Sequence, residues 1–178
     1  MPLIETPRTV IRLMTAADAD FIRELLNEPS FLRFIGDRQV RTTDDAGQFI
    51  DRRYQQSYRD HGYGLYVVES RESGESMGIC GFVRRDSLPA VDMGFAFLPR
   101  CEGKGFAFES AAATLQYGRD SLGLTRVLAI AQADNARSLA LLDRLGFAFD
   151  RLITMPGEAQ PVSMYASEPP LASATVAT

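Results

Sequence analysis

A glycine-rich bend at residues 100–105, RCEGKG, has the composition of an anion-binding site. Gly103 and Gly105 have no side chains, so a phosphate group can approach the backbone N–H groups closely. Arg100 and Lys104 add positive charge at the same place. The pattern alone is weak, because a plain turn that needs glycine for its backbone conformation has the same sequence.

The elements predicted on either side of the bend favour the anion site. Residues 90–98 predict a strand, and an alanine-rich helix follows over about residues 106–121. A bend between a strand and a helix start exposes N–H groups that lack an intrahelical partner. A further strand at 126–132 completes one βαβ unit, so its two strands are expected to be parallel and adjacent.

Two common phosphate-binding motifs are absent from the sequence. No G-x-x-x-x-G-K-[ST] pattern occurs, which excludes a P-loop. A dinucleotide fingerprint requires a third glycine where this chain has Phe108, and a doubly wound fold requires more βαβ units. The bend therefore belongs to another class of phosphate site.

The whole chain alternates between strand and helix patterns in the order βααβββαβαββ. Thr15 is a suitable N-cap for a first helix that Pro29 ends, and Thr42 or Thr43 can cap a second. Asn135 can cap the last helix. The remaining predicted strands cover residues 9–14, 62–70, 76–85, 147–155 and 162–167.

Length and charge limit the class of protein. The chain has 178 residues, 46% of them hydrophobic, and a net charge of −4. We expect one α/β domain over 1–166 and a disordered tail over 167–178, which lacks a periodic apolar face. A pI of about 5.1 argues against a dedicated nucleic-acid binder. Without a long apolar run or a signal peptide, the chain is expected in the cytoplasm and not in a membrane.

Cysteine and histidine are too few for a disulfide framework or a metal site. Cys80 and Cys101 are expected to be buried free thiols. His61, the one histidine, has no partner motif and is expected at the surface or in a loop. No metal is predicted.

Three segments together resemble a known family. The bend RCEGKGFAFES, the preceding AVDMGFAFLP and the later ADNARSLALLDRLGF look like the GNAT superfamily of acyl-CoA-dependent N-acyltransferases, and most like its Rim-type branch of ribosomal-protein N-terminal acetyltransferases. The resemblance extends to about Ala166. It implies a single GNAT-like domain with a mixed, mostly antiparallel sheet, whose central parallel strands splay apart between flanking helices. It also implies acetyl-CoA as co-substrate and an amine as acceptor.

The resemblance also assigns cofactor-binding residues. Residues 100–105 would hold the pyrophosphate of coenzyme A through backbone amides, and the end of the preceding strand would hydrogen-bond the pantetheine arm. The implied set is Phe97, Leu98, Arg100, Glu102, Gly103, Lys104, Gly105, Phe106, Ala107 and Asn135.

Acyl transfer needs a group that removes a proton from the amine. Asp92 is the candidate base, because it lies in an apolar strand at a position where relatives often carry Glu; a solvent-facing strand residue is the open alternative. Glu109 is interpreted as a solvated residue of the following helix.

The sequence offers no strong acid to assist the thiolate as it leaves. Many relatives place a tyrosine at the position of Leu142, so a phenol acid is not expected here. Ser138 would instead donate a hydrogen bond to the sulfur, or water would serve, although Ser138 can equally be a first-turn helix residue with no catalytic role. Backbone amides near residues 95–97 would polarise the carbonyl.

The leading hypothesis is an N-acetyltransferase that acts by direct attack in a ternary complex. Two alternatives stay open: a catalytically silent acyl-CoA-binding or interaction module, and an unrelated binder of a phosphate ligand. The acceptor, a protein N-terminal α-amine or a small amine, would be selected by loops such as 28–42 and 154–161. The excess of negative charge suits a cationic amine, and dimerisation is left open.

Overall fold

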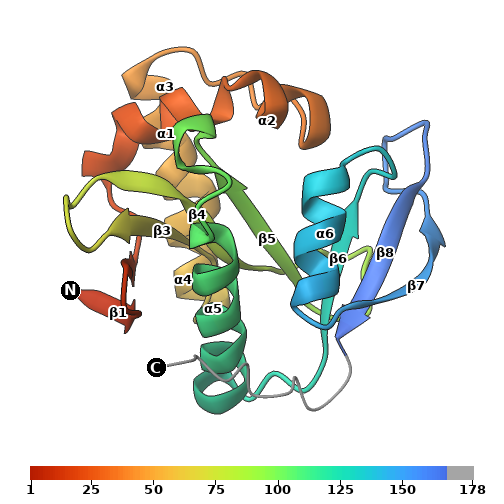
Figure 1. The fold of residues 1–178 in the computed structure, drawn as a ribbon. Helices are drawn as coiled ribbons and strands as arrows, with labels where there is room; N and C mark the ends of the chain where they lie inside the picture. The colour runs from red at the N-terminus through yellow and green to blue at the C-terminus, as the bar shows by residue number, and fades with distance from the viewer. Residues whose placement is uncertain (168–178) are drawn as a thin grey trace.

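Eight strands form one sheet in the computed structural model, which describes residues 1–167 (Figure 1). The spatial order is β1-β2-β3-β4-β5-β6-β8-β7, and every neighbouring pair is antiparallel except β5 and β6. The strands are β1 Pro2–Glu5, β2 Thr9–Arg12, β3 Leu65–Ser70, β4 Ser76–Val83, β5 Asp92–Phe97, β6 Val127–Ala131, β7 Ala148–Ile153 and β8 Val162–Ser167.

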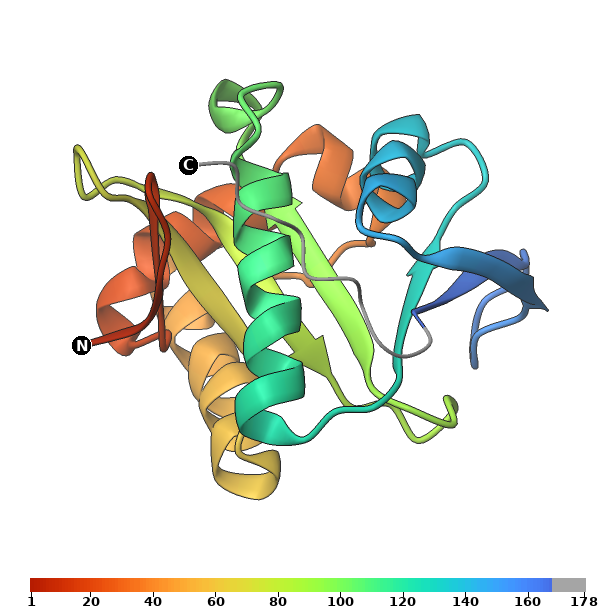
Figure 2. The same cartoon turned by 60° about the horizontal axis from the view of Figure 1, so that its bottom comes forward.

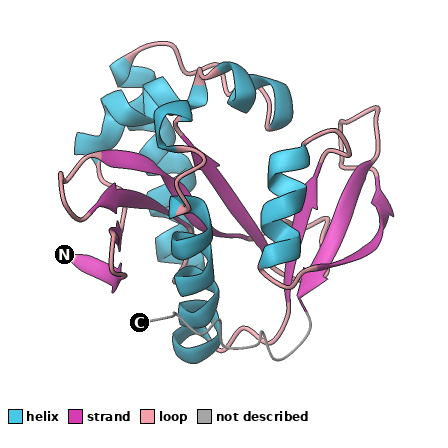
Figure 3. Ribbon diagram, viewed as in Figure 1, coloured by secondary structure: helices cyan, strands magenta, loops and turns pink. Residues whose placement is uncertain are grey.

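Helices cover both faces of this sheet (Figures 1 to 3). One face carries α5, and the other carries α1, α3 and α4, with α6 packed against β6 beyond the central strands. The predicted mixed α/β fold is confirmed. The helices are α1 Ala19–Leu26, α2 Pro29–Phe34, α3 Thr43–Phe49, α4 Gln56–His61, α5 Phe106–Leu122 and α6 Ala136–Arg144.

The longest helix, α5, packs closely on the sheet because of one glycine. A Cβ atom on Gly118 would lie 2.5 Å from the ring of Phe82 on β4. Any larger residue would push the helix away from the sheet. This contact fixes the height of α5, and with it the position of the helix N-terminus that follows the glycine-rich bend.

The N-terminal third differs from the sequence prediction in two places. The strand expected over 9–14 corresponds to β2, which forms a hairpin with the preceding strand β1. The sequence did not predict β1, because it is only four residues long and has no clear alternating pattern. Pro29 does not simply end the first helix but opens α2, since its missing N–H group costs nothing at a first helical position. Thr42, one of the two caps proposed for the next helix, accepts a hydrogen bond from the amide of Asp45.

The helix after Thr42 is also interrupted. Residues Ile50–Gln55 form a π-helical segment between α3 and α4, whereas the sequence pattern predicts one continuous helix. Such segments insert an extra residue per turn and often occur at functional sites. The segment therefore changes the direction of the side chains that follow α3.

The last strand extends one residue past the expected domain boundary at 166. Ser167 belongs to β8 and is buried. The remainder of the predicted tail lies outside the described residues. Within 1–167, no helix has the length and apolar character needed to cross a membrane.

Candidate active site

The parallel strands β5 and β6 meet at one point and then diverge. Asp92 on β5 pairs with Leu128 on β6, and no further pair joins these strands in the described part of the chain. The Leu128 amide donates to the Val91 carbonyl at 2.8 Å. Beyond this point the edge of β5 that faces β6 has no partner strand, so a ligand with amide groups can hydrogen-bond to it. The predicted splaying of the central strands is confirmed.

The glycine-rich bend lies at the end of β5 and leads directly into α5. Gly103 and Gly105 have φ of 71° and 83°, the left-handed region that glycine adopts without strain. The first intrahelical bond runs from the amide of Glu109 to the carbonyl of Gly105 at 3.1 Å, so the preceding amides have no acceptor within the helix. No atom lies within 4 Å of a Cβ built on Gly103. The bend therefore has the free donors and the open space that a pyrophosphate requires.

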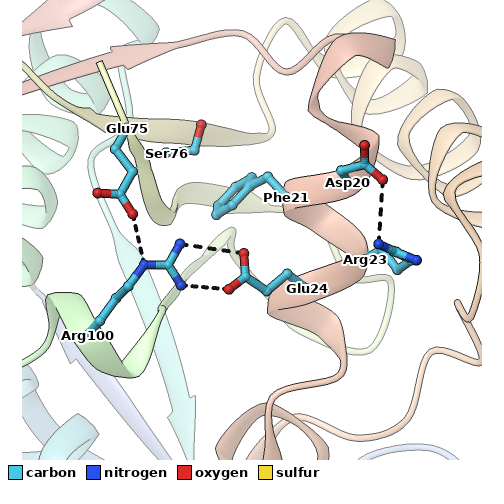
Figure 4. Close-up of a pocket in the computed structure, with 7 residues that line it drawn as sticks. All are labelled: Asp20, Phe21, Arg23, Glu24, Glu75, Ser76 and Arg100. Carbon is cyan, nitrogen blue, oxygen red and sulfur yellow. Dashed lines mark hydrogen bonds and ion pairs between the residues drawn. The ribbon is translucent and has the colours of Figure 1, made fainter. Parts of the chain in front are cut away.

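The Arg100 side chain points away from these amides. It donates to Glu24 on α1 at 2.6 Å and to Glu75, in the β3–β4 turn, at 2.8 Å (Figure 4). Its charge is thus already matched by two carboxylates. The ammonium of Lys104 donates to the Arg100 carbonyl at 2.9 Å. The added positive charge that the sequence suggested at the bend is therefore partly engaged within the protein, and the backbone is the main anion-binding element.

Glu109 is not the solvated face residue expected from the sequence. Its carboxylate accepts from the Thr6 hydroxyl at 2.6 Å, the Arg8 amide at 2.8 Å and the Arg8 Nε at 2.7 Å. Arg8 also donates to the Lys104 carbonyl at 2.9 Å and lies over the ring of Phe106. The β1–β2 turn thus holds both the bend and the first turn of α5. Because Arg8 is some hundred residues distant in the sequence, local patterns carry no signal for this link.

A second ion pair crosses from the bend to the start of α6. Glu102, a predicted cofactor-binding residue, pairs with Arg137 in the first turn of α6. Asn135 caps α6 by accepting from the Ser138 amide at 3.3 Å. The Ser138 hydroxyl is half-buried and makes no hydrogen bond to any described residue. The Glu102–Arg137 pair therefore links the bend to the start of α6.

Asp92, the candidate base, is 1% exposed, which rules out the solvent-facing alternative. Its carboxylate accepts from the Arg85 Nε at 2.9 Å. Burial raises the pKa of Asp92, and the nearby Arg85 charge opposes this shift. Asp92 therefore lies at the junction of the two strands, in surroundings that make a carboxylate more basic than usual.

Strand alternation places Asp92 on the face of the sheet opposite α5. Met93 pairs with Phe82, which contacts α5, so the neighbouring Asp92 points the other way. That face also carries the segments predicted to select the acceptor. Arg38, between α2 and α3, interacts electrostatically with Glu158 in the β7–β8 loop. The two proposed acceptor loops therefore lie near each other.

The structure also shows where the remaining residues considered from the sequence lie. Leu142, which replaces the tyrosine of many relatives, is 1% exposed in the core. Cys80 and Cys101 are buried and free, as predicted, and burial raises the pKa of Cys80 to about 12. His61 is the exposed last residue of α4 and stacks on Tyr63. Among the described residues, no group of His, Cys, Asp or Glu side chains could hold a metal ion.

Parallel central strands that diverge, with a glycine-rich bend leading from one of them into a helix, are typical of α/β proteins that bind a phosphate-containing ligand at that helix N-terminus. The family model for the acetyltransferase (GNAT) domain matches residues 8–148. The chain therefore belongs to the GNAT family and is an acetyltransferase.

Individual relatives agree with this assignment. The chain is 27% identical over 147 residues to the uncharacterized N-acetyltransferase YoaA of Bacillus subtilis, covering 82% of each protein. It is 32% identical over 87 residues to the [ribosomal protein uS5]-alanine N-acetyltransferase of Escherichia coli, covering 48% of this chain and 43% of that protein.

A solved structure shows the same fold. RimL, a ribosomal L7/L12 alpha-N-protein acetyltransferase in complex with coenzyme A, superposes with a TM-score of 0.81 at 16% identity. The match covers 94% of this chain and 98% of RimL.

Proposed function

We propose that this protein transfers an acetyl group from acetyl-CoA to a primary amine, either a protein N-terminal α-amine or a small amine. The observation that carries the proposal is the divergence of β5 and β6 directly beside the open amides of the bend. An acyl-CoA needs both features: a strand edge for its pantetheine amides and free N–H donors for its pyrophosphate.

The bend and the start of α5 bind the pyrophosphate in this proposal. The amides of Gly103, Lys104, Gly105, Phe106 and Ala107 supply the donors. Phe97, at the end of β5, hydrogen-bonds the pantetheine arm through its backbone groups. Leu98 does not share this role, because its amide donates to the Met77 carbonyl at 2.9 Å and its carbonyl accepts from the Cys101 amide at 2.8 Å. The Glu102–Arg137 pair and the Asn135 cap hold the opposite side of the cleft.

Asp92 acts as the general base in a direct attack. The amine nitrogen forms a bond to the acetyl carbon, the carbon–sulfur bond breaks, and the amine proton passes to the Asp92 carboxylate. An α-amine of pKa near 8 is already about one-tenth neutral at pH 7, whereas a lysine amine is almost wholly protonated. The α-amine therefore places the smaller demand on a single buried carboxylate.

The Ser138 hydroxyl donates a hydrogen bond to the departing sulfur, and the thiolate takes up its proton from water. Ser138 is suited to this role because its hydroxyl has no described partner, while its amide is fixed by the Asn135 cap. A phenol is not available at position 142, where Leu142 is part of the core. Coenzyme A is a tolerable leaving group without a strong acid, since thiols have a pKa near 8.5.

An acceptor screen tests the proposal. The protein is incubated with acetyl-CoA and a panel of peptides and small amines, and free thiol is followed over time. We expect release of thiol that depends on the acceptor. If calorimetry shows coenzyme A binding but no acceptor supports release, the proposed reaction is wrong and the chain is a binding module.

A further inference from the structure

Three arginines gather on the acceptor side of the sheet. Arg38 lies between α2 and α3, Arg53 lies in the π-helical segment, and Arg85 follows β4. The pKa of Arg38 is lowered, mainly because the side chain is partly removed from solvent. Repulsion from Arg53 and Arg85 lowers this pKa further, and the weaker attraction of Glu158 opposes the shift. The electrostatic potential around Arg38 is therefore positive, although the whole chain has a net charge of −4.

Arg38 and Arg53 line a surface hollow of about 310 Å³ together with Arg52. Asp45, the one carboxylate of this lining, is already used, since it accepts from the amides of Arg41 at 3.0 Å and Thr42 at 2.9 Å. The hollow thus contains more positive charge than the protein itself neutralises.

The guanidinium groups of Arg38 and Arg53 have few partners within the protein. Arg38 donates to one backbone carbonyl, that of Ile35, at 3.3 Å. Arg53 has no hydrogen bond or ion pair with any residue between 1 and 167. Arginine forks without carboxylate partners are suited to binding a carboxylate or a phosphate.

The arginine cluster is continuous with the candidate base. Arg85 both donates to the Asp92 carboxylate and repels Arg38. An amine that reaches Asp92 from this face would therefore bring the rest of its molecule close to Arg38 and Arg53. A negative charge there relieves the mutual repulsion, whereas a polyamine adds to it.

We propose that the acceptor is a peptide α-amine followed directly by acidic residues, whose carboxylates Arg38 and Arg53 bind. This inference rests on the proposed acetyl transfer and specifies its substrate class. It differs from the expectation, drawn from the net charge of the whole chain, that a cationic acceptor would fit. The local arrangement of charge decides the preference, because exposed charges are screened beyond about 10 Å.

Matched acceptors test the inference. Hexapeptides that begin with alanine and carry two aspartates, two alanines or two lysines next are compared with free aspartate and spermidine, using acetyl-CoA and thiol release. We expect kcat/KM to be about tenfold higher for the acidic peptide than for the alanine peptide, with the lysine peptide and spermidine lowest.

Variants show whether the arginines cause the preference. Arg38→Gln and Arg53→Gln should each remove most of it, and Arg53→Glu should reverse it, mainly through KM. Arg119→Gln, on the exposed end of α5, is the matched control and should keep the preference. Coenzyme A affinity and the melting temperature, measured for every variant, show that each one is folded.

The outcomes separate the two proposals. Thiol release without preference for acidic peptides, or with preference for basic ones, overturns this inference and leaves acetyl transfer intact. If free aspartate is a better acceptor than the acidic peptide, the inference that the acceptor is a peptide is wrong. No thiol release with any acceptor, despite coenzyme A binding, overturns the proposed function and this inference with it.

Discussion

Arg85 donates to the Asp92 carboxylate at 2.9 Å, at the place where β5 and β6 begin to separate. Burial of the Asp92 carboxyl raises its pKa, and the positive charge of Arg85 opposes this shift. Arg85 is therefore a positioning residue that also sets the basicity of the candidate base.

The first prediction concerns this pair. Asp92→Asn should lower kcat by about 100-fold, because general base catalysis contributes this order of magnitude, with little change in coenzyme A affinity. Arg85→Gln should move the acidic limb of the kcat/KM profile to higher pH, since the opposing positive charge is lost. Rates measured from pH 5 to 9 check both effects. An unchanged limb in Arg85→Gln together with full activity in Asp92→Asn removes Asp92 as the base.

The second prediction concerns the bend. Gly103→Glu should abolish coenzyme A binding, because it places a carboxylate where the pyrophosphate approaches the amides. Gly103 has φ of 71°, so any side chain adds backbone strain, and Gly103→Ala is the matched control. We expect the alanine variant to bind more weakly and the glutamate variant not at all in calorimetry. Equal affinity of Gly103→Glu and the unchanged protein would sink this placement of the cofactor.

The third prediction concerns the link between the β1–β2 turn and α5. Glu109→Gln should lower the free energy of unfolding by about 1–2 kcal/mol at neutral pH, since it removes charged hydrogen bonds. Burial alone would raise the pKa of Glu109, but hydrogen bonds from Thr6 and Arg8 outweigh it and hold the pKa below its ordinary value of 4.5. The contribution is present above that value and is lost as the pH falls through the lowered pKa. Denaturation curves should therefore converge for the two proteins in acid.

The fourth prediction separates the hydroxyl of Ser138 from its place in the helix. Ser138→Ala keeps the amide that Asn135 caps, so the melting temperature should hardly change. If the hydroxyl stabilises the departing thiolate by a hydrogen bond, kcat should fall about tenfold, because a hydrogen bond to a charged group is lost and water replaces it only in part. Asn135→Ala is the contrasting variant and should cost about 1 kcal/mol of stability through loss of the cap. A kcat for Ser138→Ala equal to that of the unchanged protein would remove Ser138 from the reaction.

The elements that position the cofactor site could be predicted because their signals are local. The glycines of the bend, the apolar strand before it and the alanine-rich helix after it lie within about thirty consecutive residues. The N-cap residues Thr42 and Asn135 were readable for the same reason, since a cap is recognised from the side chain at the helix start.

The electrostatic partners could not be predicted, because they come from distant parts of the chain. The sequence places the positive charge of Arg100 at the bend, yet Glu24 and Glu75 pair with it from other elements. The arginine cluster was missed for a similar reason. Arg38 and Arg53 line the same hollow although they lie on different segments, and the π-helical segment that contains Arg53 has no sequence signature of its own.

The last strand of the chain, β8, lies between β6 and β7 (Figure 1). On its other side β6 meets β5 at one position, so it depends on Val162–Ser167 for nearly all of its pairing. During synthesis, one wall of the cleft therefore cannot assemble until the end of the domain has been translated. A chain that stops before Val162 would contain the glycine-rich bend but would lack the strand that pairs with β6. If the bend binds the acyl donor as proposed, such a chain would offer only half of the site.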